Sequence, residues 1–189
     1  MAESHGDVVI LNFASAKNPG GGWLHGAKAQ EEDICRQSCL GYLLEMFPEF
    51  YLENKKANAL YTDYIIYNPD VMFFRDDNYK FLETPYTASV ITSPAPNCNN
   101  LLLNDLKKVP DVLNSRACAI LNIAAMNGHR NIVLGAWGCG VFKNNPKHVA
   151  KAFKLALEKF PYFENVCFAI YETKPWKPNL IAFKEVFGI

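Results

Sequence analysis

The stretch DVVILNFASAKNPGGGWLHGAKAQEE, residues 7–32, joins an apolar segment to a glycine triplet and then to two adjacent glutamates. Its first part, residues 7–14, is apolar and rich in β-branched side chains, which predicts a buried strand. Gly20, Gly21 and Gly22 follow in a loop, although a glycine triplet weakens any helix or strand that contains it. The loop therefore needs either positive φ angles or a very close approach of its backbone to another group.

Beyond this loop the spacing of apolar residues becomes helical. It predicts one helix from Gln30 to about Met46, whose inner face carries Cys35, Cys39, Leu43 and Met46. Glu32 heads this face, and Glu31 is rotated from it by about 100°, so that it can reach the loop or a ligand hydroxyl. Acidic residues in a first helical turn are usually partners of the helix dipole. Burying an unpaired carboxylate is costly, however, so Glu32 needs a structural or functional reason to be there.

The rest of the chain alternates strands with helices, which predicts a layered α/β domain around a central sheet. Further strands are expected at 88–96, 131–137 and 165–172, and two short extended pieces around the turn Asn68-Pro69-Asp70. Helices are expected within 49–60, from Pro110 to Asn127, from Asn145 as N-cap, and over 179–187. The predicted inner face of the helix after Pro110 consists of Leu113, Ala117, Ile120 and Ala124.

A second glycine-rich loop, GAWGCGVF at 135–142, also follows an expected strand. Ligands of open α/β sheets bind at the carboxyl ends of the strands, and backbone N–H groups before a helix can bind an anion. Each loop alone could be an ordinary strand-to-helix turn, but two of them favour a phosphate-bearing ligand. The standard dinucleotide and phosphate-loop motifs are both absent from the sequence.

Composition excludes several classes of function. The 189 residues suffice for one domain, and 19 basic residues balance 19 acidic ones, so we expect no stable binding to duplex nucleic acid. The six cysteines are scattered and no signal peptide precedes them, which predicts an intracellular protein, cytoplasmic or nuclear, with reduced thiols. The histidines and cysteines lack the spacing of a zinc site, so we expect no metal. No apolar run approaches the roughly 18 residues that span a bilayer, so we expect no membrane association.

The motif LNFASAKNPGGG, followed by seven residues and then QEE at 30–32, resembles that of microbial-type poly(ADP-ribose) glycohydrolases, which are divergent macrodomains. SPAPN at 93–97 and GAWGCGVFKNNP at 135–146 resemble later motifs of this family, in the same order. The resemblance implies a three-layer α/β/α fold with a mixed central sheet. Microbial members usually carry a helical region before the first strand. Here we expect residues 1–189 to form a single macrodomain-like domain without it.

The same resemblance implies roles for individual residues. Glu32 would be the catalytic acid and base, and Glu31 would hold ribose hydroxyls beside the bond that breaks. Asn18, or as a second choice Ser15, would contact the distal ribose, and Phe142 would pack against a ribose. The remaining expected substrate-binding residues, most of which would wrap the diphosphate, are Gly20, Gly21, Gly22, Gln30, Gly138, Cys139, Gly140 and Val141.

The sequence is therefore compatible with two functions from different classes. The first is a glycohydrolase that releases ADP-ribose from poly(ADP-ribose) or from mono-ADP-ribosylated targets, as a monomer and without a cofactor. The second is a non-catalytic ADP-ribose-binding module, which has less need of the intact pair Glu31 and Glu32. A nucleotide-diphosphate hydrolase is disfavoured because no metal-binding carboxylate cluster is visible. His25 as a base is disfavoured because a histidine in such a loop is more often a solvated bystander. Cys139 as a nucleophile is disfavoured because it has no nearby partner.

Overall fold

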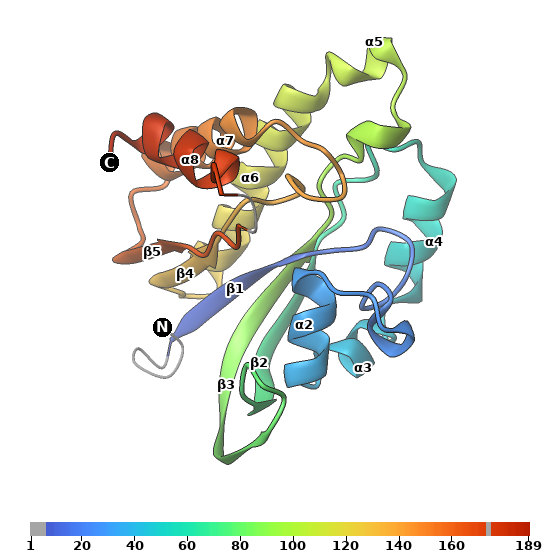
Figure 1. The fold of residues 1–189 in the computed structure, drawn as a ribbon, viewed down its shortest axis with the longest axis vertical. Coiled ribbons are helices and arrows are strands. Elements are labelled where there is room, and N and C mark those ends of the chain that lie inside the picture. The colour runs from blue at the N-terminus through green and yellow to red at the C-terminus, as the bar shows by residue number, and fades with distance from the viewer. Residues whose placement is uncertain (1–6, 173–174) are drawn as a thin grey trace. The chain divides into compact units, whose positions relative to one another are not determined.

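The computed structural model describes residues 7–172 and 175–189. The chain divides into two compact units (Figure 1). The first consists of Met1–Ala57 and Tyr61–Pro94, and the second of Asn58–Leu60 and Ala95–Ile189. Among the described residues, no helix is both long and apolar enough to span a membrane.

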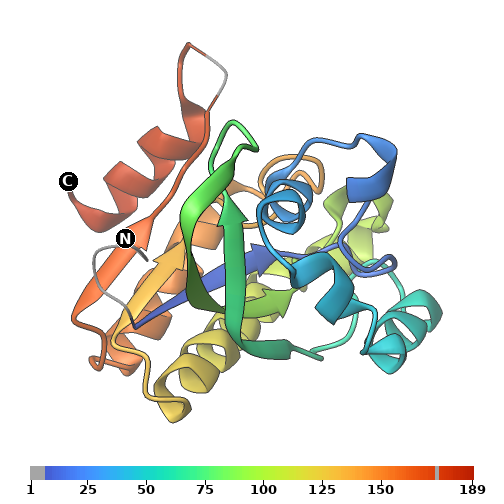
Figure 2. The ribbon, with the colours of Figure 1, turned by 90° about the horizontal axis from the view of Figure 1, so that it is seen from below.

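Three strands form the sheet of the first unit: β1 (Val8–Phe13), β2 (Ile66–Arg75) and β3 (Phe81–Ser93). β3 lies between the other two, parallel to β1 and antiparallel to β2, so the sheet is mixed (Figure 2). The predicted first strand is confirmed, and its side chains are largely buried. Since β1 and β3 run parallel in register, they end together at Phe13 and Ser93, where the glycine loop begins.

The helical part of this unit differs from the prediction. The expected single helix from Gln30 to Met46 is wrong, because α2 (Gln30–Gln37) ends at an extended Ser38 and α3 (Leu40–Leu44) follows. The Ser38 hydroxyl donates to the Ile34 carbonyl and accepts from the Leu40 N–H, so this side chain replaces helical backbone bonds. Because of this break, the four residues expected on one inner face do not share it, and Met46 is 73% exposed. A further helix, α4 (Pro48–Lys56), confirms the one expected within 49–60.

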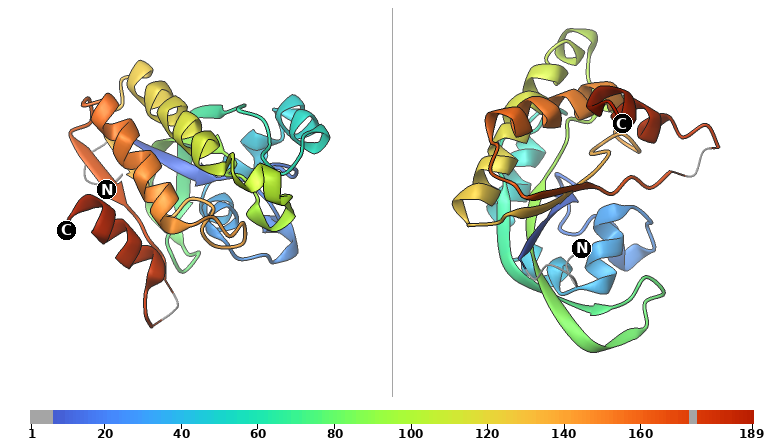
Figure 3. Two further views of the ribbon diagram at one scale, coloured as in Figure 1. Left: turned by 90° about the horizontal axis from the view of Figure 1, so that it is seen from above. Right: turned by 90° about the vertical axis from the view of Figure 1, so that its left-hand side faces the viewer.

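The region around Asn68-Pro69-Asp70 is also corrected. Instead of two pieces around a turn, β2 is one strand with an irregularity between Asn68 and Val71, where Asp70 has a φ of 48°. β3 starts at Phe81, well before the expected position 88. The two strands form a long hairpin that curves back to α2 (Figure 3, right), where Tyr79 donates to an Asp33 carboxylate oxygen and Arg75 to the Arg36 carbonyl.

The second unit contains two parallel strands, β4 (Asn131–Leu134) and β5 (Asn165–Phe168). Its main helices are α6 (Val109–Met126), α7 (Pro146–Lys159) and α8 (Pro178–Phe187), and α7 contacts both α6 and α8 (Figure 3, left). Two short elements precede them, the 3-10 helix η2 (Cys98–Asn100) and α5 (Leu103–Leu106).

The predictions for the second unit are largely confirmed. The four residues predicted for the inner face of α6 are all fully buried. Asn145 caps α7, because its side chain accepts a hydrogen bond from the Lys147 N–H. The last strand is shorter than expected, since β5 ends at Phe168.

Candidate active site

The glycine loop after β1 has the two properties that the sequence demands of it. Gly20 and Gly21 have φ angles of 67° and 63°, which L side chains rarely adopt. A Cβ atom on Gly21 would lie 2.3 Å from Glu32 Oε1 and 3.2 Å from Glu31 Oε2. The loop passes so close to the two carboxyl groups that no side chain fits between them.

Both glutamates lie at the start of α2 and are bound by backbone N–H groups of the preceding segment. Gly22 donates to Glu32 Oε1 at 3.0 Å, and Ser15 donates to Glu31 Oε2 at 2.6 Å. Asn12, on β1, donates its side-chain N–H to Glu31 Oε1 at 3.2 Å. Glu31 is 2% exposed and Glu32 is 9% exposed. The prediction that Glu31 can reach the loop is therefore confirmed, but Glu31 is the more deeply buried of the two acids.

Burial raises the pKa of Glu31 from its ordinary value of 4.5 to about 8, since a charged carboxylate is poorly solvated there. The hydrogen bonds from Ser15 and Asn12 act in the opposite direction, and the neighbouring Glu32 adds to the increase. Glu31 is thus mostly neutral at pH 7.

This pKa predicts a pH dependence of stability. Between pH 4.5 and 8, the folded protein holds a proton on Glu31 that the unfolded chain has lost. We therefore expect this group to lower the free energy of unfolding by about 1.4 kcal/mol per pH unit as the pH rises through that window. The stabilisation that comes from the proton on Glu31 is complete below pH 4.5 and is fully lost above pH 8. Urea unfolding of wild type and Glu31→Gln across this window measures the difference, because the amide does not titrate. Parallel stability curves for the two proteins would contradict the assignment.

The side chain of Gln30 contacts the backbone of β1. Its Nε2 donates to the Leu11 carbonyl at 2.7 Å, and its Oε1 accepts from the Phe13 N–H at 2.8 Å. No local sequence pattern indicates these contacts, because Gln30 is brought to Leu11 and Phe13 only by the fold. In this structure the carboxamide expected to contact substrate is engaged with the strand.

The other predicted residues of this loop lie nearer the surface. Asn18 is exposed, and its backbone carbonyl accepts from the Gly21 N–H at 3.0 Å. The Ser15 hydroxyl accepts from the Lys17 and Asn18 N–H groups, which shapes the turn before the glycines. His25 is exposed at the end of the 3-10 helix η1 (Trp23–His25).

The second glycine loop lies in the second unit and is also closely packed. Gly138 has a φ of 70°, and a Cβ there would lie 2.4 Å from Ala95 Cβ and 2.6 Å from Asn144 Nδ2. Asn144 is buried and donates to the carbonyls of Pro96 and Gly138. It therefore ties SPAPN to the glycine loop, a role that sequence analysis missed. Only its place within GAWGCGVFKNNP, one of the quoted motifs, could have drawn attention to it.

The expected ligand-binding residues after Gly138 differ in exposure. Val141 is 72% exposed, whereas Phe142 is half-buried and its carbonyl accepts from the Cys98 N–H at 2.9 Å. Burial raises the pKa of the Cys139 thiol to about 12, and Cys98 and Glu172 add to the increase. A nucleophilic cysteine needs the thiolate, so this environment does not suit one.

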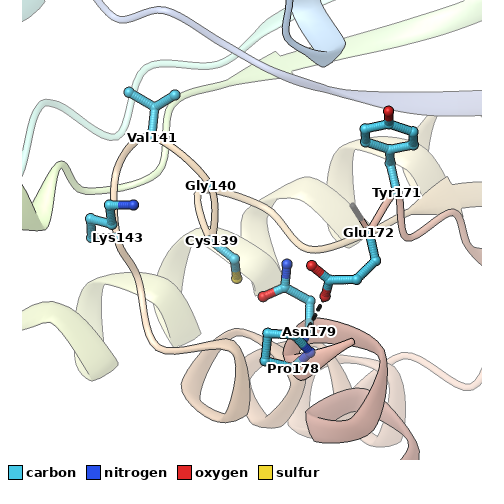
Figure 4. A pocket seen from close by; sticks show the side chains of 8 residues that line it. All are labelled: Cys139, Gly140, Val141, Lys143, Tyr171, Glu172, Pro178 and Asn179. Carbon is cyan, nitrogen blue, oxygen red and sulfur yellow. Dashed lines mark hydrogen bonds between the residues drawn. The ribbon is translucent and has the colours of Figure 1, made fainter. Parts of the chain in front are cut away.

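A pocket of about 360 Å³ lies beside this loop (Figure 4). Cys139, Gly140, Val141 and Lys143 contribute to its lining, as do Tyr171, Glu172, Pro178 and Asn179. Asn179, in the first turn of α8, donates its backbone N–H to the Glu172 carboxylate at 2.8 Å. The predicted loop residues thus border an open space in the second unit.

Comparisons with known proteins point to one family. The family model described as "Microbial-type PARG, catalytic domain" matches residues 1–76, where PARG denotes poly(ADP-ribose) glycohydrolase. The PARG of Deinococcus radiodurans, crystallised in complex with ADP-ribose, is 44% identical with a TM-score of 0.91, covering 98% of this chain and 77% of that one. The PARG of Thermomonospora curvata, bound to the inhibitor ADP-HPD, is 41% identical with a TM-score of 0.91. The match covers 97% of this chain and 72% of that one. No curated protein gives a significant match.

These similarities extend over nearly the whole chain, at an identity well above the level at which only a fold is shared. They confirm the predicted α/β, macrodomain-like fold, which the mixed sheet and its helices already indicated. Both glycine-rich motifs fall within the matched length, and the first also lies within the residues that the family model covers. This chain belongs to the microbial-type poly(ADP-ribose) glycohydrolase family.

Proposed function

We propose that this protein is a glycohydrolase that releases ADP-ribose from poly(ADP-ribose) or from mono-ADP-ribosylated targets. One observation carries the proposal: two largely buried carboxyl groups lie against a glycine loop that leaves no room for a side chain. This packing holds the carboxyl groups in place, and a positioned carboxyl group beside a glycosidic bond is suited to general acid–base cleavage. The relatives crystallised with ADP-ribose and with ADP-HPD support the same ligand class.

In this proposal Glu32 acts as both acid and base. It protonates the leaving ribose oxygen, and it then takes a proton from the water that attacks the oxocarbenium-like carbon. The N–H of Gly22 fixes one of its oxygens, so the carboxyl group is held in place before substrate binds. Glu31 holds ribose hydroxyls, and as a mostly neutral group at pH 7 it has an O–H to donate.

The remaining contacts are assigned to the two loops. Backbone N–H groups of Gly20–Gly22 and of Gly138–Phe142 would bind the diphosphate of ADP-ribose, since such groups bind anions without a formal charge. Asn18 would contact the distal ribose, for which its exposed side chain is available. The protein would act as a monomer on ADP-ribosylated macromolecules.

A release assay tests this function. The protein is incubated, with and without a chelator, with poly(ADP-ribose), with mono-ADP-ribosylated protein and with mono-ADP-ribosylated DNA, and free ADP-ribose is quantified. We expect release from at least one substrate, unchanged by the chelator. If the protein binds ADP-ribose but releases none from any substrate, the alternative of a non-catalytic binding module replaces the enzyme.

Phe142→Ala is expected to weaken ADP-ribose binding by about 1–3 kcal/mol, because it removes a ring proposed to pack against a ribose. Phe142 is only half-buried, so the fold should tolerate the change. Calorimetric titration with ADP-ribose measures the effect. Leu155→Ala, at an exposed apolar residue of α7 outside both loops, is the control. An unchanged affinity of folded Phe142→Ala would assign the ring to packing alone.

A further inference from the structure

We infer that Gln30 is a positioning residue, which fixes the first turn of α2 and so sets the place of both glutamates relative to β1. The inference rests on the proposed function, because the residues that Gln30 positions are the proposed acid pair. It replaces the expectation that Gln30 contacts substrate.

The contacts of Gln30 reproduce those of a parallel strand. In a parallel ladder, one residue accepts from the N–H of one neighbour and donates to the carbonyl two positions earlier on the facing strand. The Gln30 carboxamide accepts from Phe13 and donates to Leu11, at 2.8 and 2.7 Å. It therefore occupies the position of a strand residue opposite Asn12. Two such hydrogen bonds fix both the position of the side chain along β1 and its orientation relative to the strand.

The helix that carries the acids has few other means to hold its first turn. α2 has eight residues, and its N-cap, Ala29, provides no side-chain cap. A helix of this length is only marginally stable on its own, so its position depends on tertiary contacts. Because Gln30, Glu31 and Glu32 are consecutive in one turn, any displacement of Gln30 moves both carboxyl groups with it.

Separate contacts hold the rest of α2. Near its C-terminal end, Arg36 donates to the carbonyls of Trp23 and Ala27, and its own carbonyl accepts from Arg75 of the hairpin. In the first turn, Tyr79 of the hairpin donates to the exposed Asp33. None of these bonds reaches β1. The register between the acid pair and the strand therefore depends on Gln30, together with the hydrogen bonds of the two glutamates themselves.

A substrate-binding role would disrupt this arrangement. If the carboxamide turned toward a ligand, the Phe13 N–H and the Leu11 carbonyl would both lose their partner. Leu11 is 1% exposed, so its carbonyl could not readily bind water instead. The two roles thus make opposite predictions for the Phe13 amide when ligand binds.

Amide hydrogen exchange of wild type, measured by NMR at single-residue resolution, separates the two roles. We expect the Phe13 amide to be protected in the free protein and to stay protected in saturating ADP-ribose. Faster exchange at Phe13 upon ADP-ribose binding would overturn the proposal, because it would mean that Gln30 leaves the strand. This measurement requires neither turnover nor a variant.

A matched pair of variants tests the consequence for catalysis. Gln30→Met keeps the length of the side chain but removes both hydrogen bonds. Gln37→Met makes the same change in the same helix, where the side chain donates to the exposed Asp33 and not to β1. We expect Gln30→Met to lower kcat by about 10- to 100-fold, the scale of a misplaced catalytic group, with KM and the Kd for ADP-ribose within about threefold of wild type. Gln37→Met should retain wild-type kcat.

The remaining outcomes are decisive. A loss confined to KM and Kd would make Gln30 a substrate ligand, and an unchanged kcat in folded Gln30→Met would remove its positioning role. Absence of turnover in wild type would instead refute the proposed function, and the exchange measurement at Phe13 would still report on the contact with β1.

Discussion

Glu32→Gln is expected to make ADP-ribose release nearly undetectable, a loss of about 10⁴-fold or more, while the affinity for ADP-ribose changes by less than about tenfold. General acid–base groups typically contribute about 10²- to 10⁴-fold, and a site with one dominant acid should lie at the upper end or beyond. The glutamine oxygen can still accept the hydrogen bond that Gly22 donates at 3.0 Å, so the loop should keep its conformation. Release assays give the rate, and calorimetry gives the affinity.

Glu31→Gln is the control for the neighbouring acid. It replaces a group that is mostly neutral at pH 7 by another neutral group, so its effect on the rate should be milder. It could weaken binding, since Glu31 is proposed to hold ribose hydroxyls. If Glu32→Gln hydrolysed substrate as fast as wild type, Glu32 would not be the acid. If Glu31→Gln alone abolished turnover, the two roles would be reversed.

Gly21→Val is expected to abolish ligand binding and activity while lowering the thermal stability only moderately. The valine Cβ would lie 2.3 Å from Glu32 Oε1, so either the loop or the carboxyl group must move. The φ of 63° is also poorly suited to a β-branched residue. Calorimetry with ADP-ribose and a thermal unfolding curve measure the two effects separately.

Gly26→Val provides the matched control for this experiment. Gly26 has a φ of 81° in the same loop region, but within the described part of the chain a Cβ there meets no atom closer than 4 Å. It therefore introduces similar backbone strain without a collision with the acids, and it should retain most of the binding. Normal binding by Gly21→Val would mean that the triplet is only a turn. Equal losses in both variants would assign the effect to backbone strain.

Much of this molecule follows from local sequence patterns. The strand at β1 and the inner face of α6 are encoded by the spacing of apolar residues a few positions apart, and both are confirmed. The requirement for glycine before the acids is also readable, because a triplet has few explanations other than positive φ or close approach. The prediction of one continuous helix over α2 and α3 was wrong, because the buried hydroxyl of Ser38 competes for backbone hydrogen bonds.

The sequence by itself determined the type of fold, the glycine loops and the acid pair, because each is recorded in residues that are near one another along the chain. Only the tertiary structure decided how deeply those acids are buried and which groups bind them. Glu31 is the more deeply buried of the two acids, and its burial raises its pKa although Asn12 and Ser15 donate hydrogen bonds that lower it. The place of α2 depends on the contact of Gln30 with Leu11 and Phe13. Burial and hydrogen bonding of a polar side chain are set by groups far away in sequence, whose distances no local pattern contains.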